Sequence, residues 1–585
     1  MTRIAVIDKE KCSPSKCQNL CLKLCPRNRT GEECIVMGED GKPEIDETIC
    51  TGCGICSNRC PFEAIHIINL PEELDKDPIH QYGKNGFRLY NLPIPLFGKV
   101  VGILGQNGIG KSTAIKIISG ILKPNMGDLS KKEHDVNELI KFFKGTEAQI
   151  FFEKVKNKEI TIAYKPQSVD LIPRTFNGKV KELLKKVDEK NNIKEITKKL
   201  GIEKILESNI SEISGGELQR VAIAACVLKK ANLYVFDEPT SYLDVKQRII
   251  VSKFIRDLAD EDTAVIVVEH DLIILDYIAD LINVMYGQEG CYGVVSMPKS
   301  AKAGINIYLD GYLKEENIRF RNNKIKFQTN APAKMTNENI LTSWENIEKS
   351  LGNFQLKAEK GNIYKKAIIG VLGENAIGKT SFVKILAGVI KQDNGEIKEK
   401  IKVSYKPQYI NTNSDEIVAS VLKDAIIGYN TQIVKPLNLK QLLTKKVNEL
   451  SGGELQRVAI AECLSKKAEL YLLDEPSAYL DVEQRLILSK VIKDLAEKEG
   501  KTMLIVDHDV LFIDYLSDEL IVFEGEPALK GKVNGPFTMT EGMNKFLNSL
   551  DMTFRRDPES KRPRANKLNS QMDQKQKKEN KFYYV

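Results

Sequence analysis

Short apolar runs that end in polar or charged residues recur along this chain and predict buried strands. Three such runs occur in each half of the chain, in the same order, and helical stretches separate them. The runs are Val100–Leu104, Leu233–Glu238 and Val265–His270 in the first half, and Ala367–Leu372, Leu470–Glu475 and Leu504–His508 in the second. Strands that alternate with helices indicate a mostly parallel α/β sheet in each half.

An identical heptapeptide shows that the second half repeats the first. The sequence Ser-Gly-Gly-Glu-Leu-Gln-Arg occurs at Ser214–Arg220 and at Ser451–Arg457. Each copy precedes an Asp-Glu-Pro sequence by the same distance, so that Ser214 is spaced from Glu238 as Ser451 is from Glu475. A Tyr-Lys-Pro-Gln sequence also occurs once in each half. We infer that one functional module was built twice in a single polypeptide.

The first copy is longer than the second. The distance along the sequence from Lys111 to Gln167 is almost twice the distance from Lys379 to Gln408. The first copy therefore carries an insert, which we place within Asp128–Ile160. The insert is predicted to form two short helices, at Val136–Phe143 and around Glu147–Val155.

Composition narrows the class of protein. The chain has 585 residues, of which 42% are apolar and 29% charged, as in soluble globular proteins with several domains. No apolar run approaches the ~18 residues of a membrane span, and the N-terminus lacks the apolar core of a secretory signal. We expect a cytoplasmic protein, with the nucleus as a further location, and no membrane partner. The net charge of +7 says little about partners.

Two basic segments follow the repeated modules. Asn317–Arg321 and Met552–Arg556 share a Phe-Arg pair, and residues 551–585 contain ten basic and five acidic side chains. One interpretation is a solvated, partly disordered tail. The other is an ordered arm that also contacts nucleic acid.

Each copy contains a phosphate-binding loop, Gly-x-x-x-x-Gly-Lys-Ser/Thr, directly after a predicted strand. Its glycines let backbone N–H groups surround phosphate, its lysine reaches the β- and γ-phosphates, and its hydroxyl can bind Mg²⁺. Ala376 replaces the glycine found at Gly108, which limits backbone freedom in the second loop. The predicted ATP and Mg²⁺ residues are Gly105, Asn107, Gly108, Gly110, Lys111, Ser112, Thr113, and Gly373, Asn375, Gly378, Lys379, Thr380, Ser381.

Two carboxylates end the second strand of each copy. Asp237 and Asp474 suit Mg²⁺ coordination, and Glu238 and Glu475 suit a base that polarises the attacking water. The alternative is a structural role as helix caps.

A glutamine and a histidine complete each set. Gln167 and Gln408 can reach the metal or the attacking water; the alternative is an exposed loop amide. His270 and His508 occupy equivalent places after apolar strands, which favours contact with the γ-phosphate.

The heptapeptide supplies a second phosphate site in each copy, because Ser-Gly-Gly at a helix start offers a hydroxyl and exposed N–H groups. That site is redundant within one copy but useful if each heptapeptide caps the nucleotide held by the other copy. The residues concerned are Ser214, Gly215 and Gly216, and Ser451, Gly452 and Gly453.

Nine of the twelve cysteines lie at or before Cys60. Cys50-x2-Cys53-x2-Cys56-x3-Cys60-Pro is the bacterial ferredoxin run for [4Fe–4S] clusters, and a looser run ending in Cys-Pro precedes it. The fourth cysteine of each run serves the other cluster in two-cluster ferredoxins. We therefore predict two clusters, with ligands Cys12, Cys17, Cys21 and Cys60, and Cys25, Cys50, Cys53 and Cys56. Cys34 is left over, and zinc is the alternative metal.

The repeated motifs resemble those of ATP-binding cassette ATPase domains. The resemblance implies head-to-tail pairing, in which Lys111, Gln167, Glu238 and His270 face Ser451–Gly453, while Lys379, Gln408, Glu475 and His508 face Ser214–Gly216. Asp244 and Asp481 match the family's cross-dimer loop. Tyr82 and Phe87 are candidates to stack on adenine, with ordinary packing as the alternative.

The whole chain resembles the E subfamily of these proteins, the ribosome-recycling factors also called RNase L inhibitors. The match covers the cysteine runs, the cassette motifs, the insert and the Phe-Arg arms. It implies ATP-driven splitting of ribosomes after termination or rescue, followed by association with the small subunit towards initiation. The expected partners are the small subunit with its ribosomal RNA, a class-one release factor or its rescue relative, and initiation factors. The insert would contact the small subunit, and Tyr308–Arg321 and Met552–Lys567 would be hinges.

The expected domains are a ferredoxin-like α+β iron–sulfur domain (1–75), nucleotide-binding domain one (76–290, insert about 128–160), hinge one (291–325), nucleotide-binding domain two (326–530), and hinge two with a basic tail (531–585). The second copy has Ala376 where the first has Gly108, and Asp507 where the first has Glu269. These differences suggest that the two ATP sites work at different rates. Three other functions remain open from the sequence: a transporter ATPase subunit, an ATP-driven reductase, and a scaffold without turnover.

Overall fold

The computed structural model describes residues 2–9, 11–38, 40–46, 49–70, 77–129, 136–321, 324–325, 327, 339–399, 401–408, 410 and 414–583. The chain divides into two compact units. The first consists of Met1–Pro239, Phe254–His270 and Ile278–Asn322, and the second of Thr240–Lys253, Asp271–Tyr277 and Asn323–Val585. None of the helices in these described ranges combines the length and hydropathy that crossing a membrane requires.

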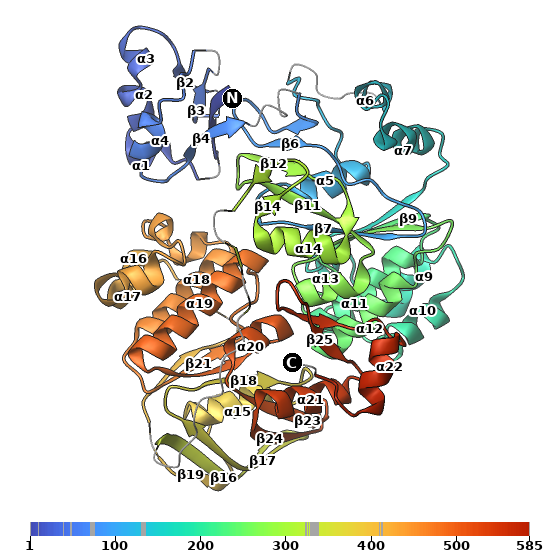
Figure 1. The fold of residues 1–585 in the computed structure, drawn as a ribbon, viewed down its shortest axis with the longest axis vertical. Coiled ribbons are helices and arrows are strands. Elements are labelled where there is room, and N and C mark those ends of the chain that lie inside the picture. Colours follow the sequence, from blue (N-terminus) through green and yellow to red (C-terminus); the bar gives the residue numbers. More distant parts are fainter. Residues whose placement is uncertain are drawn as a thin grey trace. The chain divides into compact units, whose positions relative to one another are not determined.

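The cysteine-rich N-terminal part of the first unit is a small α+β fold (Figure 1). Its strands form two antiparallel pairs, β1 with β4 and β2 with β3. Three of the nine cysteines, Cys17, Cys21 and Cys56, lie in short helices, and the other six lie in the segments between the elements. The elements are β1 Thr2–Ile7, α1 Pro14–Cys17, α2 Leu20–Leu24, α3 Pro26–Arg29, β2 Ile35–Met37, β3 Pro43–Ile45, α4 Ile55–Arg59 and β4 Ile65–Leu70.

The first large sheet has a parallel centre in the order β11-β7-β10-β9-β8. Every residue of β7, β9 and β10 is buried, because both faces of the sheet are covered, which explains their continuous apolar sequences. β12, β6, β5 and β13 extend the sheet. The strands are β5 His80–Gln81, β6 Arg88–Tyr90, β7 Val100–Leu104, β8 Ile162–Lys165, β9 Leu233–Asp237, β10 Ala264–Val268, β11 Leu281–Gln288, β12 Tyr292–Val295 and β13 Lys299–Ser300.

The second sheet repeats this plan, with a parallel centre in the order β23-β18-β22-β21-β20. A long antiparallel hairpin, β16 with β17, is added at one side, and its Trp344 packs edge-on against Phe382 in the core. The strands are β16 Ile340–Leu351, β17 Phe354–Tyr364, β18 Ile368–Leu372, β19 Asn394–Ile397, β20 Val403–Lys406, β21 Leu470–Asp474, β22 Thr502–Val506, β23 Glu519–Glu526 and β24 Lys530–Thr538.

Both sheets continue past the domain ends that we expected at residues 290 and 530. β12 pairs with β11, and β24 pairs with β23, in the same antiparallel arrangement. The segments that we expected to be hinges therefore still contain sheet strands at their start.

The helices begin mainly after the carboxyl ends of the parallel strands. Those of the first copy are α5 Lys111–Ile118, α6 Val136–Phe142, α7 Glu147–Lys156, α8 Ile172–Thr175, α9 Val180–Val187, α10 Ile193–Lys199, α11 Gly215–Val227, α12 Val245–Arg256, α13 Leu272–Ile278 and α14 Ala301–Asp310. Those that follow are α15 Lys379–Leu386, α16 Val418–Val421, α17 Lys423–Gly428, α18 Gly452–Ser465, α19 Val482–Glu499, α20 Val510–Leu516, α21 Met539–Ser549 and α22 Gln571–Lys578. Glu203–Ile205, Lys440–Leu442 and Val447–Glu449 are 3-10 turns, and Asn430–Val434 is a π-helix.

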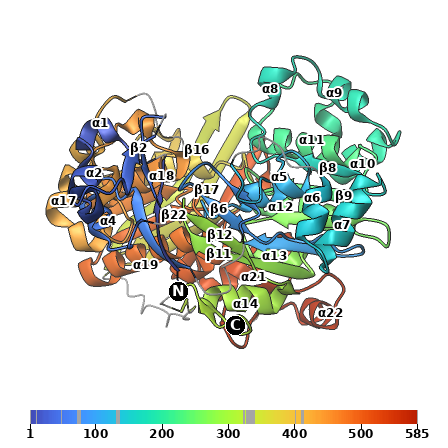
Figure 2. The same ribbon diagram turned by 90° about the horizontal axis from the view of Figure 1, so that it is seen from above.

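The insert forms the two helices that its sequence predicted. α6 and α7 lie side by side (Figure 2), and Phe143 and Phe152 stack between them with ring centroids 5.6 Å apart. Phe151 and Phe152 are buried in the core of the first sheet, so the insert is anchored to the cassette.

The basic C-terminal segment is ordered. β25 Phe554–Arg556 pairs with β26 Pro563–Ala565, and the side chains of Phe582 and Tyr583 are buried. Within the second unit, Arg562 is fully buried 3.1 Å from Asp276. The interpretation as an ordered arm is therefore the correct one; its contact with nucleic acid stays a prediction. β14 Tyr312–Leu313 and β15 Ile318–Arg319 form the shorter arm.

Candidate functional site

The first phosphate-binding loop joins β7 to α5. Gly110 is the N-cap of α5, so the N–H groups of the first helical turn face the loop. The Nζ atom of Lys111 donates a hydrogen bond to the carbonyl oxygen of Gly105 at 2.9 Å. Ser112 hydrogen-bonds to Asp237 at the end of β9, which brings the two predicted Mg²⁺ ligands together. Asn107, Gly108 and Thr113 belong to the same loop and helix start.

The second phosphate-binding loop has the same construction. Lys379 donates to the carbonyl oxygens of Gly373 and Glu374 at 2.6 and 2.8 Å. Burial lowers the pKa of Lys379 to about 8. The hydroxyl of Thr380 donates to Asp474 at 2.8 Å, as Ser112 does in the first copy. Asn375, Gly378 and Ser381 complete this loop.

Glu238 lies at the centre of the first set of predicted catalytic side chains. Its Oε1 atom accepts a hydrogen bond from Gln167 Nε2 at 2.8 Å and lies 3.4 Å from His270 Nε2. Burial opposes ionisation of Glu238, but His270, Lys111 and Gln167 outweigh burial and lower its pKa to about 2. Burial and the charge of Glu238 raise the pKa of Asp237 to about 6.

Glu475 has the same neighbours in the second copy. Its Oε1 atom accepts from Gln408 Nε2 at 2.8 Å and lies 3.5 Å from His508 Nε2. Burial again opposes ionisation, and His508, Lys379 and Gln408 together lower the pKa of Glu475 to about 2. Both glutamates have positive φ angles, 46° for Glu238 and 48° for Glu475, in a region that side chains rarely occupy. Such strain is common where a side chain must be aimed at a ligand.

Two buried side chains in each copy fix the backbone of these carboxylates, and the sequence interpretation missed both. At the end of β9, Lys165 Nζ donates a hydrogen bond to the carbonyl oxygen of Asp237 at 3.0 Å. Gln219 Nε2 donates to the carbonyl oxygen of Glu238 at 2.7 Å. The counterparts, Lys406 and Gln456, make the same bonds at the end of β21. The signal was present, since both residue types lie in sequences that the two halves share. Burial lowers the pKa of Lys165 and of Lys406 to about 8.

The heptapeptides begin helices α11 and α18. Ser214 and Ser451 are the N-caps, and each exchanges hydrogen bonds with the glutamate three residues later. Ser214, Gly215, Ser451 and Gly452 are exposed, and Gly216 and Gly453 are half-buried. The start of each helix is therefore an accessible set of N–H donors, as a cap for a phosphate requires.

Asp244 contacts the second phosphate-binding loop within the second unit. Its Oδ2 atom accepts a hydrogen bond from the N–H of Asn375 at 2.9 Å, and Lys246 forms an ion pair with Glu374 at 2.9 Å. Asp481 caps α19 by accepting from the N–H of Gln484. The contact with Asn375 supports the role predicted for Asp244.

The two adenine-stacking candidates differ in exposure. Tyr82 is 47% exposed, and its hydroxyl lies 3.4 Å from the hydroxyl of Thr113. Phe87 instead packs beneath the helix start, where a Cβ atom on Gly110 would lie 2.5 Å from its ring. Phe354 occupies the equivalent place in the second copy, a position that we did not predict although Phe-x-Leu occurs in both. The packing alternative thus describes Phe87, and Tyr82 stays the candidate.

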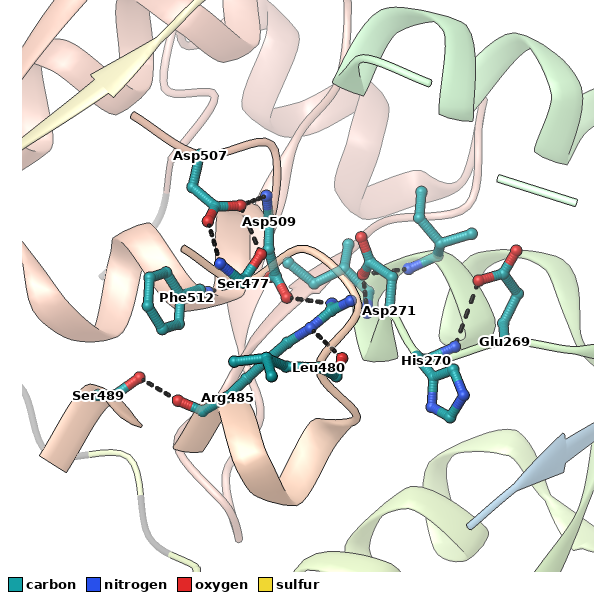
Figure 3. A network of polar contacts seen from close by, with 12 residues as sticks. Glu269, His270, Asp271, Ser477, Leu480, Arg485, Ser489, Asp507, Asp509 and Phe512 are labelled. Atoms are coloured by element: carbon teal, nitrogen blue, oxygen red, sulfur yellow. Dashed lines mark hydrogen bonds and ion pairs between the residues drawn. The ribbon is translucent and has the colours of Figure 1, made fainter. Parts of the chain in front are cut away.

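In each copy, an arginine connects two segments. One is the cross-dimer segment, which contains Asp244 or Asp481, and the other contains the residue after a predicted catalytic histidine. In Figure 3, Arg485 bonds Asp509 at 2.6 Å and the carbonyl oxygen of Leu480 at 2.9 Å. Arg248 makes the equivalent ion pair with Asp271 at 2.9 Å. The sequence interpretation did not single out either arginine.

The residues before the two histidines, Glu269 and Asp507, are both buried carboxylates. Asp507 accepts hydrogen bonds from Ser477, at 2.9 Å from its N–H and 2.7 Å from its hydroxyl (Figure 3). Burial and the nearby Asp509 raise the pKa of Asp507. Glu269 accepts a hydrogen bond from the N–H of His270 at 3.3 Å. The difference in rate between the two sites stays a prediction.

The cysteines of the N-terminal region lie close together, and their division between two clusters stays a prediction. Burial, followed by the neighbouring Cys21, Cys60 and Cys17, raises the pKa of Cys12 to about 11. Burial, with Cys50 first among the neighbouring thiols and Cys53 also contributing, raises the pKa of Cys56 to about 12. One cavity is lined by Cys25, Cys34, Cys50, Cys53 and Cys56, which brings Cys25 of the first run beside the second run.

The donor chemistry of both groups fits an iron–sulfur cluster. Four crowded thiols in a largely apolar setting suit a cationic iron cluster, which would stabilise their ionised forms. Among the described residues, no three His, Cys, Asp or Glu side chains converge as ligands of a single metal ion do. Cluster ligands bind separate iron atoms and surround the cluster instead. Cys34, 1% exposed, lies beside Cys25 and Cys50.

Three family models match four parts of the chain. The model described as "ABC transporter" matches residues 96–241 and 356–478. The model described as "Possible Fer4-like domain in RNase L inhibitor, RLI" matches residues 2–33, and the 4Fe-4S binding domain matches residues 43–66.

Curated relatives are similar over the full chain. Translation initiation factor RLI1 of Saccharomyces cerevisiae is 44% identical over 100% of this chain and 98% of its own length. An uncharacterised ABC transporter ATP-binding protein of Methanocaldococcus jannaschii is 53% identical, with the same coverage. The chain belongs to the ABCE1/RLI1 family. It therefore carries two ABC ATPase cassettes and a 4Fe–4S-binding N-terminal region, as the sequence predicted.

Solved structures of ABCE1 proteins have the same fold. An archaeal ABCE1, in a model of ribosome-bound archaeal Pelota and ABCE1, is 51% identical, with a TM-score of 0.93 over 100% of this chain and 99% of the other. The archaeal ribosome recycling factor aABCE1, in a crystal structure with the ribosomal stalk protein aP1, is 50% identical. Its TM-score is 0.83, over 88% of this chain and 100% of the other. The predicted fold class is confirmed.

Proposed function

We propose that this protein is an ATP-driven ribosome recycling factor. It splits ribosomes into subunits after termination or rescue and stays with the small subunit towards initiation. The observation that carries the proposal is the full-length similarity to an archaeal ABCE1 described as bound to the ribosome with Pelota. The expected partners are the small subunit with its ribosomal RNA, a class-one release factor or its rescue relative, and initiation factors. Action on ribosomes would place the protein in the cytoplasm.

Each cassette would bind ATP through its own phosphate-binding loop and the heptapeptide of the other. Lys111 and Lys379 hold the β- and γ-phosphates, and Ser112 with Asp237, or Thr380 with Asp474, hold Mg²⁺. The exposed first residues of α11 and α18, Gly215 and Gly452, suit the far side of a γ-phosphate. ATP then favours the closed pair of cassettes, and hydrolysis releases it.

Glu238 and Glu475 are placed to act on the water that attacks the γ-phosphate. Glu238 and Glu475 are ionised at neutral pH and orient the attacking water, together with the glutamine and histidine that contact each of them. Carboxylates with pKa values of about 2 are weak bases, so we assign them mainly to orienting and polarising water. His270 and His508 would contact the γ-phosphate.

We propose two [4Fe–4S] clusters with a structural role. When bound, the clusters would cross-link the two cysteine runs and stiffen the N-terminal domain. The domain could then act as a rigid lever moved by the cassettes. Splitting should proceed equally with oxidised and with reduced clusters.

The test is sedimentation of purified ribosomes with this protein, a release factor and ATP. We expect separate subunits with the native protein. The double variant Glu238→Gln, Glu475→Gln should hydrolyse ATP at least about a hundredfold more slowly and remain on the small subunit with trapped ATP. Intact ribosomes with the native protein, and neither trapping nor ribosome association with the variant, would contradict the proposal.

A further inference from the structure

The tip of the turn between β11 and β12 contacts both the first phosphate-binding loop and the iron–sulfur domain. The N–H of Gly290 donates a hydrogen bond to the carbonyl oxygen of Gly108 at 3.0 Å. On the other side, Lys11 Nζ lies 3.7 Å from Glu289 Oε1. We infer that Glu289 and Gly290 position the first phosphate-binding loop, and that they do so under the control of the docked iron–sulfur domain.

The side chain of Glu289 lies directly on the phosphate-binding loop. A Cβ atom added to Gly108 would be only 2.5 Å from Cγ of Glu289, so this glutamate fills the space that a side chain would need. The backbone N–H groups around Gly108 are among those that face phosphate in such loops. A shift of Glu289 would therefore change the cradle for the nucleotide.

Asp8 of the iron–sulfur domain fills the equivalent space at Gly290. A Cβ atom there would lie 2.7 Å from Oδ2 of Asp8. Asp8 also organises the loop that starts the first cysteine run, because its carbonyl oxygen accepts from the N–H of Cys12 at 3.1 Å and its carboxylate lies 3.2 Å from Lys11. Contacts thus run without a gap from a predicted cluster ligand to Gly108.

The same hairpin supports the docked domain with apolar packing. Val6 of β1 belongs to a buried cluster with Tyr286 of β11 and Cys291, which precedes β12. In addition, the N–H of Ile45 donates to the side chain of the buried Asn85 at 2.6 Å. Docking is therefore a packed interface, on which the turn at Glu289 and Gly290 is held.

Comparison with the second copy shows why the first copy has glycine at positions 108 and 290. Ala376 and Ala528 replace the two glycines, and the N–H of Ala528 makes the same hydrogen bond to Ala376 at 2.8 Å. Their φ angles are 55° and 64°, close to the 72° and 70° of the first copy, so alanine adopts this backbone conformation. Backbone freedom alone therefore does not explain the glycines of the first copy. The space taken by Glu289 and Asp8 does.

Such a coupling must act in both directions. If the docked domain positions the first phosphate-binding loop, then a nucleotide in that loop stabilises the docked form of the first cluster loop by the same factor. The second site has no such partner at Ala528 among the described contacts. The asymmetry between the two ATP sites would then arise at Gly108 and Gly290, and not from Ala376.

The test uses Gly290→Ala in the full-length protein with its clusters loaded. A Lys379→Ala background restricts a fluorescent ATP analogue with Mg²⁺ to the first site. We expect affinity to fall about fivefold or more. Adding Asp8→Ala should restore most of it, because the atom that meets the new Cβ is removed. The matched control is Ala528→Gly in a Lys111→Ala background, with a change at the second site below about twofold.

A second measurement follows the clusters. The ATP analogue should slow chelator-driven iron release from the parent protein, and Gly290→Ala should abolish this protection. If Gly290→Ala fails to load clusters, Glu289→Ala tests the same contact without a new Cβ and should weaken first-site binding. Unchanged first-site affinity in these variants, or a Gly290→Ala defect that Asp8→Ala leaves intact, would overturn the inference.

Discussion

Arg485 and Asp509 form an ion pair with 2.6 Å between Nη1 and Oδ2, and Asp509 directly follows His508 in the chain. The same arginine holds the carbonyl oxygen of Leu480, one residue before Asp481. One side chain thus links the cross-dimer segment to the segment that carries a predicted catalytic histidine. Arg248 and Asp271 repeat the arrangement after His270.

Replacing Arg485 by alanine should destabilise the second unit strongly. Asp509 is 4% exposed, so it would be left as a buried charge without its partner, at a cost of about 3 kcal/mol or more. Lys498→Ala is the control, because its pair with Asp494 is exposed and contributes about 1 kcal/mol at most. Denaturant unfolding measures both. Equal midpoints for the two variants would contradict a structural role for Arg485.

The crossed cysteine assignment predicts the effect of single replacements. Cys60→Ser should remove only the cluster of the first run, and Cys25→Ser only that of the second, so each should lower iron from about eight to about four atoms per chain. Cys226→Ser, buried far along the sequence in α11, should leave the iron content unchanged. Iron analysis with electron paramagnetic resonance of the reduced protein distinguishes the two remaining clusters. Loss of the same cluster in both variants would disprove the crossing.

The features that could be read from the sequence are those whose cause is local. β7, β9 and β10 are buried on both faces, so their residues must be apolar along the whole run. A phosphate-binding loop needs its residues at fixed spacing, and ferredoxin ligands likewise. The helices of the insert follow from its own apolar positions.

The features that were missed depend on partners that the sequence does not mark. Lys165 and Gln219 bond carbonyl oxygens, and every residue has one of these. Arg564 donates a hydrogen bond to Asp276, which lies 288 residues earlier in the chain, and neither residue belongs to a repeated motif. The many charged residues of the C-terminal segment allowed its interpretation as a solvated tail. Burial of Arg562 against Asp276 makes this segment part of the fold.

Removing the charge of Asp276 should release the C-terminal arm. Arg562 and Arg564 both pair with this carboxylate, which is 2% exposed in side-chain terms, so Asp276→Asn would leave the fully buried Arg562 without this counter-ion. We expect a loss of about 3 kcal/mol or more and faster hydrogen exchange in residues 554–583. Asp551→Asn is the control, since that residue is 75% exposed in its pair with Lys577. Exchange that is unaltered in Asp276→Asn would exclude this anchoring.

Burial of Glu519 should make the free energy of unfolding fall as the pH rises. Glu519 is 3% exposed, its Oε2 atom has no hydrogen-bond partner among the described residues, and burial raises its pKa to about 7. Between about pH 4.5 and 7 the unfolded chain loses a proton that the folded chain keeps, so folding is increasingly disfavoured. Glu519→Gln should therefore stabilise the protein at pH 8 by up to about 3 kcal/mol, and hardly at pH 4.5.

The control for this pH dependence is Glu526→Gln, at the exposed end of the same strand, β23. Thermal unfolding at both pH values measures the difference between the variants. A gain for Glu519→Gln that is the same at pH 4.5 and at pH 8 would show that the carboxyl group does not titrate as described.

The discontinuous composition of the second unit sets an order of events during synthesis. Segments Thr240–Lys253 and Asp271–Tyr277 leave the ribosome early, yet they fold with segments that are made much later, up to the C-terminal end of the chain. Asp276 and Asp514 remain without their arginine partners until the segment around 556–564 has been translated. A chain that is released before this point has two carboxylates without their arginine partners and an uncovered surface, and quality-control proteases can distinguish it from a finished one.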